Sequence, residues 1–198
     1  MDEGALEKPD LQPTLSGSLI TLRPIEHDDW AGLFTAAADP AIWADHIKTD
    51  RHKEEVFRPY FDGTVSSGSA LVVIENATGQ IIGTSRFHDF KPDIGEIEIG
   101  WTFLAREFWG GKYNAEMKTL MLEHAFRFAQ TVVFWVAAEN IRSRRAMARI
   151  GGVLRDGTFS KSYNGILYPY VVFEIARTGF LTGPLKDTQR FPSPTPAR

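Results

Sequence analysis

The stretch that most constrains the fold spans residues 98–124 and reads EIGWTFLAREFWGGKYNAEMKTLMLEH. It begins as an apolar strand, is interrupted by Gly110 and Gly111, and continues as a strongly helical run. Apolar residues recur in that run at helical spacing, so one broad face of the helix is expected to pack on a core. The sequence therefore predicts a strand, a glycine turn and a helix in direct succession.

A glycine turn that opens a helix is a candidate site for an anion. The first turn of a helix leaves about four backbone N–H groups without partners, and the helix dipole adds partial positive charge there. Glycines let this backbone approach a ligand such as a pyrophosphate closely, and Lys112 adds a full charge. Because short glycine patterns recur by chance, the pattern alone is equally compatible with an ordinary loop and a helix that merely packs on a sheet.

Two motifs resemble those of the GNAT acetyltransferases, in the branch similar to the RimJ/RimL-like ribosomal-protein N-terminal acetyltransferases. Residues 98–101 (EIGW) resemble the end of the family's strand, and residues 109–116 (WGGKYNAE) resemble its coenzyme A pyrophosphate loop. Residues 140–143 (NIRS), followed by glycines at 151–152, resemble the family's Asn-x-x-Ser…Gly helix. The resemblance extends over residues 16–177, and the two motifs occur in the family's order with a predicted strand between them.

The chain departs from the wider family pattern at three positions. Lys112 stands where that pattern has glycine, and Asn114 stands where it has glycine or alanine. The glycine at position 111 could preserve the loop, with Asn114 as the N-cap of the helix. Met147 occupies the position of a tyrosine proposed in many members to protonate the departing thiolate. These departures keep open a second hypothesis, a catalytically silent acyl-CoA-binding module.

The resemblance implies which residues bind acetyl-CoA. They are Trp101, Phe103, Leu104, Trp109, Gly110, Gly111, Lys112, Tyr113, Asn114, Asn140 and Ser143. The phosphates would lie on the backbone of residues 110–114, and the pantetheine arm would pair with the strand edge at 101–104. Ser143 is predicted to give a proton to the thiolate; the alternative is a helix-surface hydroxyl that bonds its own backbone.

Glu96 and Glu98 are the candidates for the catalytic base. They share one face of a strand because side chains alternate, and a carboxylate there can take a proton from an ammonium group. The alternative is a pair of charges on a solvated strand face. His88 is a third candidate, although a single histidine is more often structural. Four arginines of the second helix could reach the 3′-phosphate, of which one or two are expected to matter: Arg142, Arg144, Arg145 and Arg149.

Composition narrows the classes of function. The net charge of −3 gives no support for a nucleic-acid-binding protein. The sequence has neither an apolar run near 18 residues nor a basic-then-apolar N-terminal signal, so a cytoplasmic protein without membrane partners is expected. The absence of cysteine excludes thiolate metal sites and a cysteine acyl-enzyme. Acyl transfer is therefore expected to be direct, and no metal is expected.

The elements predict an α/β (α+β) fold. Strands are expected at 19–23, 70–75, 81–90, 96–104, 131–137, 152–156 continuing to Phe159, and 168–176. Helices are expected at 30–37, within 42–60, from the glycine loop onward, and from Asn140 to Arg149. Pro59 and Gly63 are expected to close the helical region at 42–60. Hairpins and one crossover make a mixed, mostly antiparallel sheet with helices on both faces, and the resemblance adds a splayed parallel pair. The domain is expected at 16–177, between a loose arm (1–15) and a proline-rich tail (178–198). Trp101, Trp109 and Trp135 are expected mostly in the core.

The implied activity is acetyl-CoA-dependent transfer of an acetyl group to a primary amine, on a small molecule such as an amino acid or antibiotic or on a protein N-terminus. A nucleotide-binding α/β protein is a weaker alternative, because the loop lacks the P-loop ending and a clean Gly-x-Gly-x-x-Gly. Residues 42–60 and 160–168 are expected to select the acceptor, and neither contains an interpretable motif. A homodimer is compatible with these features.

Overall fold

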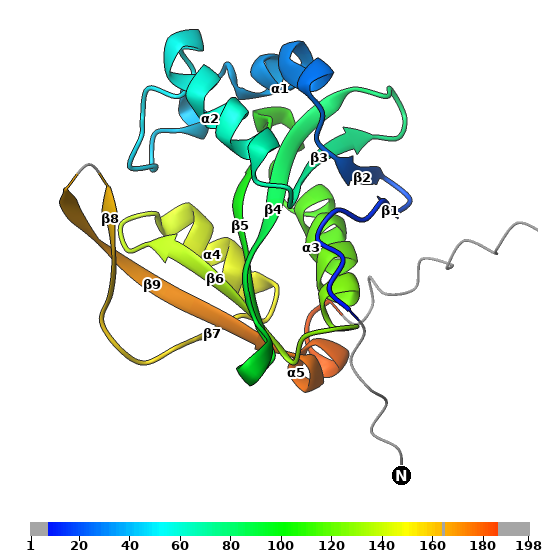
Figure 1. Ribbon diagram of the computed structural model, residues 1–198, viewed down its shortest axis with the longest axis vertical. Helices are drawn as coiled ribbons and strands as arrows, with labels where there is room; N and C mark the ends of the chain where they lie inside the picture. Colours follow the sequence, from blue (N-terminus) through cyan, green and yellow to red (C-terminus); the bar gives the residue numbers. More distant parts are fainter. Residues whose placement is uncertain (1–7, 164, 186–198) are drawn as a thin grey trace, which may run out of the picture.

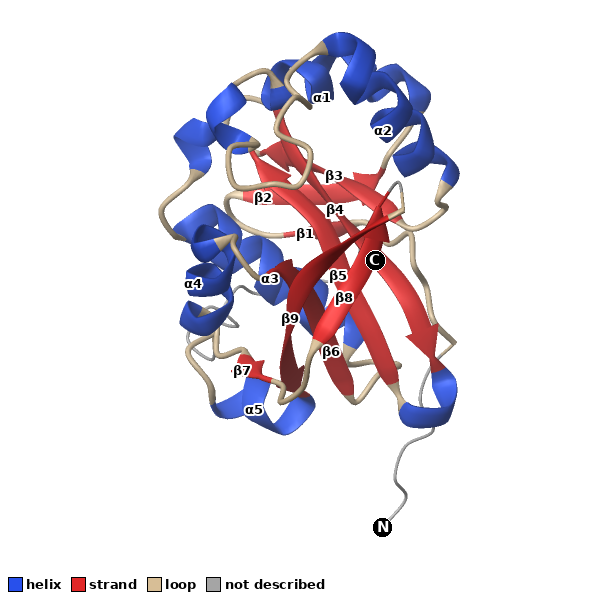
Figure 2. Cartoon of the chain, turned by 90° about the vertical axis from the view of Figure 1, so that its left-hand side faces the viewer, coloured by secondary structure: helices blue, strands red, loops and turns tan. Residues whose placement is uncertain are grey.

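The computed structural model describes residues 8–163 and 165–185 and shows a mixed sheet with helices against both faces (Figure 1, Figure 2). The strands lie in the order β1-β2-β3-β4-β5-β6-β9-β7, and β8 pairs with β9 off this path. The strands are β1 (Leu15–Ser16), β2 (Ile20–Pro24), β3 (Ala70–Glu75), β4 (Ile81–Lys91), β5 (Glu96–Leu104), β6 (Thr131–Ala137), β7 (Val153–Leu154), β8 (Phe159–Tyr163) and β9 (Ile166–Ala176). The helices are α1 (Trp30–Ala37), α2 (Glu54–Ser66), α3 (Lys112–Ala125), α4 (Ile141–Arg149) and α5 (Arg177–Thr182), with short 3₁₀ helices η1 (His27–Asp29), η2 (Pro40–Ile42), η3 (Pro92–Ile94) and η4 (Arg106–Phe108).

The predicted fold class is confirmed. The strands predicted at 70–75, 96–104 and 131–137 match β3, β5 and β6 residue for residue. These segments are dense in apolar, β-branched and aromatic residues, which fit a buried pleated surface. Among the described strands, β5 and β6 form the parallel pair, and the other neighbours in the sheet are antiparallel.

The parallel pair is splayed. β5 and β6 are in register only from Glu96↔Thr131 to Glu98↔Val133. Beyond that point β5 continues to pair with β4, while β6 pairs with β9 along its whole length. Figure 1 shows β6 and β9 diverging from β4 and β5 as two arms of the sheet. The opening between these arms is where the functional site forms.

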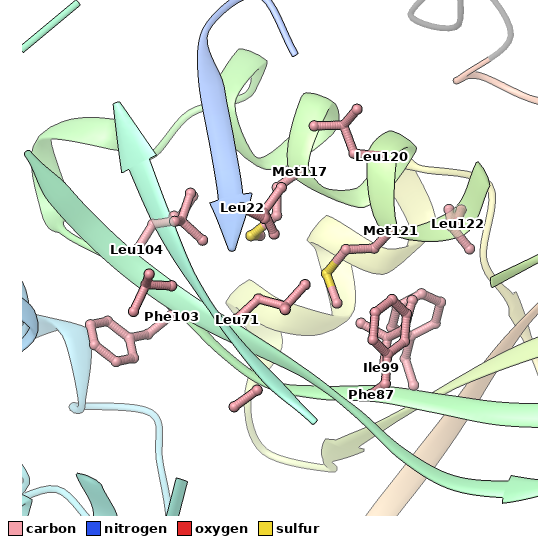
Figure 3. Close-up of a cluster of buried hydrophobic side chains, with 14 of the residues drawn as sticks. Leu22, Leu71, Phe87, Ile99, Phe103, Leu104, Met117, Leu120, Met121 and Leu122 are labelled. Atoms are coloured by element: carbon pink, nitrogen blue, oxygen red, sulfur yellow. The ribbon is translucent and has the colours of Figure 1, made fainter. Parts of the chain in front are cut away.

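Helix α3 lies against the sheet through the apolar face predicted from its periodicity. Met117 and Met121 are fully buried, and Figure 3 shows them directed from α3 towards sheet residues such as Leu22 and Phe87. Each buried apolar side chain of this size stabilises the fold by about 1.5–3 kcal/mol relative to an exposed one. This packing fixes the first turn of α3 next to the opening of the sheet.

The predicted end of the helical region at Pro59 and Gly63 is wrong, because both residues lie inside α2. Pro59 removes one intrahelical hydrogen bond. Phe57 and Phe61 flank it and are fully buried, and their rings pack against Trp30 at centroid distances of 6.0 and 5.2 Å. The buried aromatic packing outweighs the missing hydrogen bond.

Two further local predictions need correction. The strand predicted from 152 to Phe159 is two strands, β7 and β8, separated by a turn at which Gly157 has a φ of +132°. Asn114 is not the N-cap of α3, because the helix begins at Lys112 with Gly111 as its N-cap. An N-cap needs a non-helical backbone, which the two glycines supply before Asn114 is reached.

Parts of the predicted arm and tail contact the domain. The carbonyl oxygen of Asp10 accepts a hydrogen bond from Nε2 of His124 at 2.6 Å, and Leu11 packs on the core. At the other end α5 extends past residue 177, and its buried Phe180 packs on Phe126. Residues 1–7 and 186–198 lie outside the described residues, and the domain limits stay a prediction.

One buried carboxylate joins the N-terminal strands to α3. Glu116 is 1% exposed. Its Oε1 accepts hydrogen bonds from the N–H and the hydroxyl of Ser18, each at 2.8 Å, and its Oε2 accepts from the N–H groups of Leu19 and Ile20 at 2.8 and 2.9 Å. Four donors therefore converge on one side chain that lies within the motif at 109–116.

Glu116→Gln is expected to lower the free energy of unfolding by roughly 3 kcal/mol, because hydrogen bonds to a charged group contribute about 1.5–3 kcal/mol and the new amide N–H₂ would face two donors. Chemical denaturation measures this. Glu123→Gln on the same helix is the matched control, since Glu123 is exposed, and it should change stability by no more than about 0.5 kcal/mol. Equal effects of the two substitutions would contradict the role of Glu116.

Candidate active site

The splay of β5 and β6 opens into a cleft of about 920 Å³. The cleft brings together most of the predicted site residues: Glu98, Trp101, Phe103, Leu104, Trp109, Gly110, Gly111, Lys112, Asn114, Asn140 and Ser143. The candidates that do not line it are Glu96, Tyr113, His88, Arg144 and Arg145. A cleft of this size is within the range of small-molecule and cofactor sites.

The glycine loop forms one wall of the cleft and leads directly into α3. Gly110 and Gly111 have φ values of +95° and +143°, which side-chain-bearing residues rarely adopt. A Cβ at either position would meet no atom within 4 Å, so the backbone conformation and not a lack of space requires glycine. The N–H of Ala115 donates to Gly111 O at 2.9 Å, and the N–H groups of residues 112–114 precede this bond at the start of the helix. These donors and Lys112 make this wall suitable for an anion.

Arg142 braces the glycine loop. Its guanidinium group lies 4.1 Å from the centroid of the Trp109 ring, and it donates to Ile42 O at 2.8 Å. Trp109 in turn donates from Nε1 to Leu104 O at 2.8 Å. Burial lowers the pKa of Arg142, although the group remains a cation. Arg149 also lines the cleft, whereas Arg144 and Arg145 do not.

Asn140 and Ser143 lie at the start of α4. Asn140 is buried, and its Oδ1 accepts a hydrogen bond from the N–H of Ser143 at 2.9 Å, which caps the helix as predicted. Ser143 is half-buried and lines the cleft, and its hydroxyl makes no hydrogen bond to residues 8–163 or 165–185. The alternative of a hydroxyl bonded to its own helix therefore does not hold. Met147, one turn further on, is buried and also lines the cleft.

Glu96 and Glu98 have different partners. Both are buried, at 7% and 5% exposure, so the alternative of a solvated strand face is wrong for both. Glu96 accepts from Arg155 at 2.8 Å and lies away from the cleft. Glu98 lines the cleft, where its carboxylate accepts from Lys161 Nζ at 3.1 Å. Only Glu98 is placed to reach a bound molecule.

His88 and Tyr113 also lie off the cleft. His88 is exposed, packs edge-on against Trp101 at 4.8 Å, and has its pKa lowered mainly by desolvation and further by Arg86. The hydroxyl of Tyr113 donates to Glu75 Oε1 at 2.7 Å, so this side chain joins α3 to β3. The backbone of Tyr113 still belongs to the first turn of α3.

The expectation that the tryptophans lie mostly in the core needs correction. Trp101, Trp109 and Trp135 all line the cleft, and none is fully buried. Trp101 lies where the register of β5 against β4 shifts, with a φ of +51°. Such strained positions concentrate at functional sites. The hydroxyl of Tyr60 donates to Trp101 O at 3.2 Å, which fixes this irregularity from α2.

The segment at 42–60 and the β8–β9 hairpin flank the other end of the cleft. Their lining residues are Ile42, Trp43, His46, Ile47, Lys48, Arg51, Tyr60, Lys161, Ser162, Tyr163 and Tyr170. Arg51 stacks on Tyr60 at 4.5 Å. Burial, with Arg51 and Arg142 nearby, lowers the pKa of His46 to about 4, so its ring is neutral at pH 7.

Lys118 is a lining residue that the sequence analysis missed. It lies on α3 and is 2% exposed, and its Nζ donates to Thr102 Oγ1 at 2.9 Å. Burial lowers its pKa to about 7. Its position among the apolar residues of α3 was the available signal. Residues three or four apart lie on the same face of a helix, so Lys118 shares a face with Asn114 and with the core residue Met121, and this face is directed towards the sheet.

The cleft therefore combines two chemistries. The glycine loop and Lys112 present hydrogen-bond donors and positive charge at one end of the cleft, and the buried carboxylate of Glu98 lies among aromatic rings at another.

No helix among the described residues is long and apolar enough to cross a membrane. The same residues contain no group of three or more His, Asp or Glu side chains that could hold a metal ion.

Comparisons of sequence and of structure both match this chain to GNAT acetyltransferases. The family profile described as "Acetyltransferase (GNAT) domain" matches residues 20–153. A GCN5-related N-acetyltransferase from Brucella melitensis is 20% identical with a TM-score of 0.81, over 98% of this chain and 91% of that one. RimJ of Mycobacterium smegmatis, solved in complex with CoA-disulfide, is 18% identical with a TM-score of 0.65, over 88% and 90%. An acetyltransferase of the GNAT family from Bacillus anthracis is 20% identical with a TM-score of 0.67, over 83% and 98%. No curated protein matches the chain in sequence.

Proposed function

The chain belongs to the GNAT acetyltransferase family, and from this premise we propose that it moves an acetyl group from acetyl-CoA directly to a primary amine. One observation carries the proposal: the glycine loop, Ser143 and Glu98 line a single cleft. RimJ of M. smegmatis, with a similar fold, binds a coenzyme A derivative. The acyl-CoA supplies the activated thioester, and the residues of this chain bind it, orient it and move protons.

The glycine loop fits the phosphate groups. Its backbone leaves open space at Gly110 and Gly111, and the N–H groups of residues 112–114 lie at the start of α3. The free edge of β5 at residues 101–104, from which β6 has diverged, suits an extended arm that pairs as an added strand. Asn140 lines the same cleft from the start of α4, and its amide N–H₂ donates to no residue in the described part of the chain, so it is suited to donate to that arm.

Two side chains suit the proton transfers. Glu98 takes a proton from the acceptor ammonium, so that the amine nitrogen can attack the thioester carbon. As the C–S bond breaks, the Ser143 hydroxyl gives a proton to the leaving thiolate and is reprotonated by the proton that the acylated nitrogen loses on becoming an amide. Because the chain has no cysteine, no thioester can form on the protein, and the acetyl group passes directly from acetyl-CoA to the amine. These roles of Glu98 and Ser143 are part of the proposal.

A catalytically silent acyl-CoA-binding module is the second candidate, and Met147 favours it. This buried thioether occupies the position of the family's tyrosine and cannot donate a proton. Thiol release from acetyl-CoA in the presence of a panel of primary amines separates the two. Amine-dependent release supports the enzyme, whereas tight acetyl-CoA binding without release from any amine supports the silent module.

Ser143→Ala is expected to lower kcat about 10- to 100-fold, because general acid catalysis contributes at least this much. The KM for acetyl-CoA should stay nearly constant, since the backbone contacts are retained. Steady-state kinetics measure both values. Ser143→Cys, which keeps a proton donor, should retain more activity than Ser143→Ala. Unchanged kcat in the alanine variant would remove Ser143 from the mechanism.

A further inference from the structure

An aromatic cage surrounds the ammonium group of Lys161. Its Nζ lies 4.7 Å from the ring centroid of Trp135, 5.4 Å from that of Trp101 and 5.7 Å from that of Tyr170. The two carboxylate oxygens of Glu98 lie 3.1 and 3.4 Å from the same atom. The three rings come from β6, β5 and β9, so the cage bridges the two arms of the splayed sheet. All of these residues line the cleft.

This arrangement has the chemistry of an alkylammonium-binding site. Aromatic faces attract a cation through their quadrupoles, and the attraction grows when water is excluded. The Glu98 side chain is 7% exposed, so its charge acts in a desolvated setting, whereas the Lys161 side chain is 36% exposed and reaches in from the hairpin. Glu98 is thus buried in the sheet, the three rings are half-buried, and the cation that they surround comes from a strand at the cleft wall.

A second lysine–glutamate pair on neighbouring strands shows that an ion pair alone needs no such cage. Lys91 Nζ lies 3.5 Å from the carboxylate of Glu96, which is also buried. No aromatic ring lies within cation–π distance of Lys91 among the described residues, and neither member lines the cleft. The rings around Lys161 are therefore not a requirement of a lysine–glutamate ion pair on this sheet.

We propose that this cage, formed by Glu98, Trp101, Trp135 and Tyr170, is the subsite for the ammonium group of the acceptor, and that Lys161 fills it until the acceptor displaces it. The inference rests on the proposed function and specifies its substrate class. The preferred acceptor is a primary ammonium on an unbranched alkyl chain, the shape of the side chain that now occupies the cage. Displacement also frees Glu98 from Lys161, so that the carboxylate faces the incoming ammonium.

The test is binding of n-butylammonium to the coenzyme-free protein, measured by calorimetry and by the fluorescence of the cage tryptophans. Lys161→Met removes the competing ammonium group from the cage, and the variant is expected to bind the probe on the order of tenfold more tightly than the wild type. Lys161→Arg keeps a cation in place and should bind no better than the wild type. Adding Glu98→Gln to Lys161→Met should abolish the gain.

The controls separate the cage from other effects. Lys91→Met removes the matched lysine outside the cleft and should leave probe binding at the wild-type level. 1-Butanol, which is uncharged, should not bind the Lys161→Met variant measurably. Lys161→Gln repeats the experiment with a second neutral side chain, and circular dichroism confirms that each variant is folded.

Two results would overturn the inference: no tighter binding in either neutral variant, or equal binding of butanol and butylammonium. Either would make Glu98–Lys161 a structural ion pair. These measurements require no acetyl transfer, so they are independent of the proposed function. A silent module would bind butylammonium in the Lys161→Met variant without releasing thiol, whereas an enzyme without this subsite would release thiol from amines and show no such gain.

Discussion

Lys118→Met is expected to raise the free energy of unfolding at pH 7 by about 4 kcal/mol, an unusual gain for one substitution. The Lys118 amine lies in the wall of the cleft with Thr102 Oγ1 as its hydrogen-bond partner, and the cause of its lowered pKa is burial. Each pKa unit corresponds to about 1.4 kcal/mol, and the folded protein lowers the pKa from 10.5 to about 7. Methionine has a similar length, needs no proton and packs well in irregular apolar space.

The pH dependence follows from the sign of this change. Between about pH 7 and 10.5 the unfolded chain holds a proton on Lys118 that the folded protein does not. Stability of the wild type therefore rises with pH through this window, by about 5 kcal/mol in total from this group. Below pH 7 both states are protonated, so the full cost of burying the charge remains. The methionine variant lacks this part of the rise.

Chemical denaturation from pH 6 to pH 10 measures both effects. The stability curves of the wild type and of Lys118→Met should converge towards pH 10, apart from about 1 kcal/mol for the lost hydrogen bond to Thr102. Lys53→Met is the matched control at an exposed lysine and should leave the curve unchanged. Parallel curves over the whole range would mean that Lys118 keeps its proton in the folded protein.

The sequence allowed good prediction of features that local patterns determine. The strands at 70–75, 96–104 and 131–137 are compact runs of β-formers, so their limits follow from the residues themselves. The capping of α4 by Asn140 follows in the same way from one side chain and the N–H three residues later. Predictions succeeded where the residues that determine a feature lie within a few positions of that feature in the sequence.

Features that depend on the splay could not be predicted from local patterns. Strand alternation places Glu96 and Glu98 on one face, but Glu96 lies where β5 still pairs with β6, and Glu98 lies where the pairing ends. That boundary separates a carboxylate bonded to Arg155 from one that lines the cleft. The alternation of side chains along β5 does not indicate where β6 separates from it.

The aromatic cage could not be predicted from local patterns either. Trp101, Trp135 and Tyr170 belong to different strands, and no spacing in the sequence relates them. Lys161 lies in β8, within residues 160–168, which were expected to help select the acceptor but contain no motif that relates Lys161 to these rings. The chemical character of the cleft at this end thus arises only from the tertiary arrangement.

Gly111→Asp is expected to weaken acetyl-CoA binding about 100-fold, and the reason is specific to this position. A side chain at this position is strained by the φ of +143°, but the negative charge of Asp suits the positive end of the helix dipole, which offsets part of the strain at the start of α3. The same carboxylate would occupy the open space in front of the first-turn N–H groups, where phosphate oxygens are proposed to bind. Like charges a few ångströms apart at a protein surface repel by several kcal/mol.

Calorimetric titration with acetyl-CoA measures the change, and two variants divide it into its causes. Gly111→Ala introduces the strain of a φ of +143° without a charge, so its smaller loss reports the backbone alone. Gly79→Asp adds the same charge at another positive-φ glycine, in the β3–β4 turn away from the cleft, and should bind as the wild type does. Undiminished binding by Gly111→Asp would place the phosphates elsewhere. Failure of the wild type itself to bind would mean that Lys112 and Asn114 interrupt the phosphate loop, and the proposed acetyl transfer would fall with it.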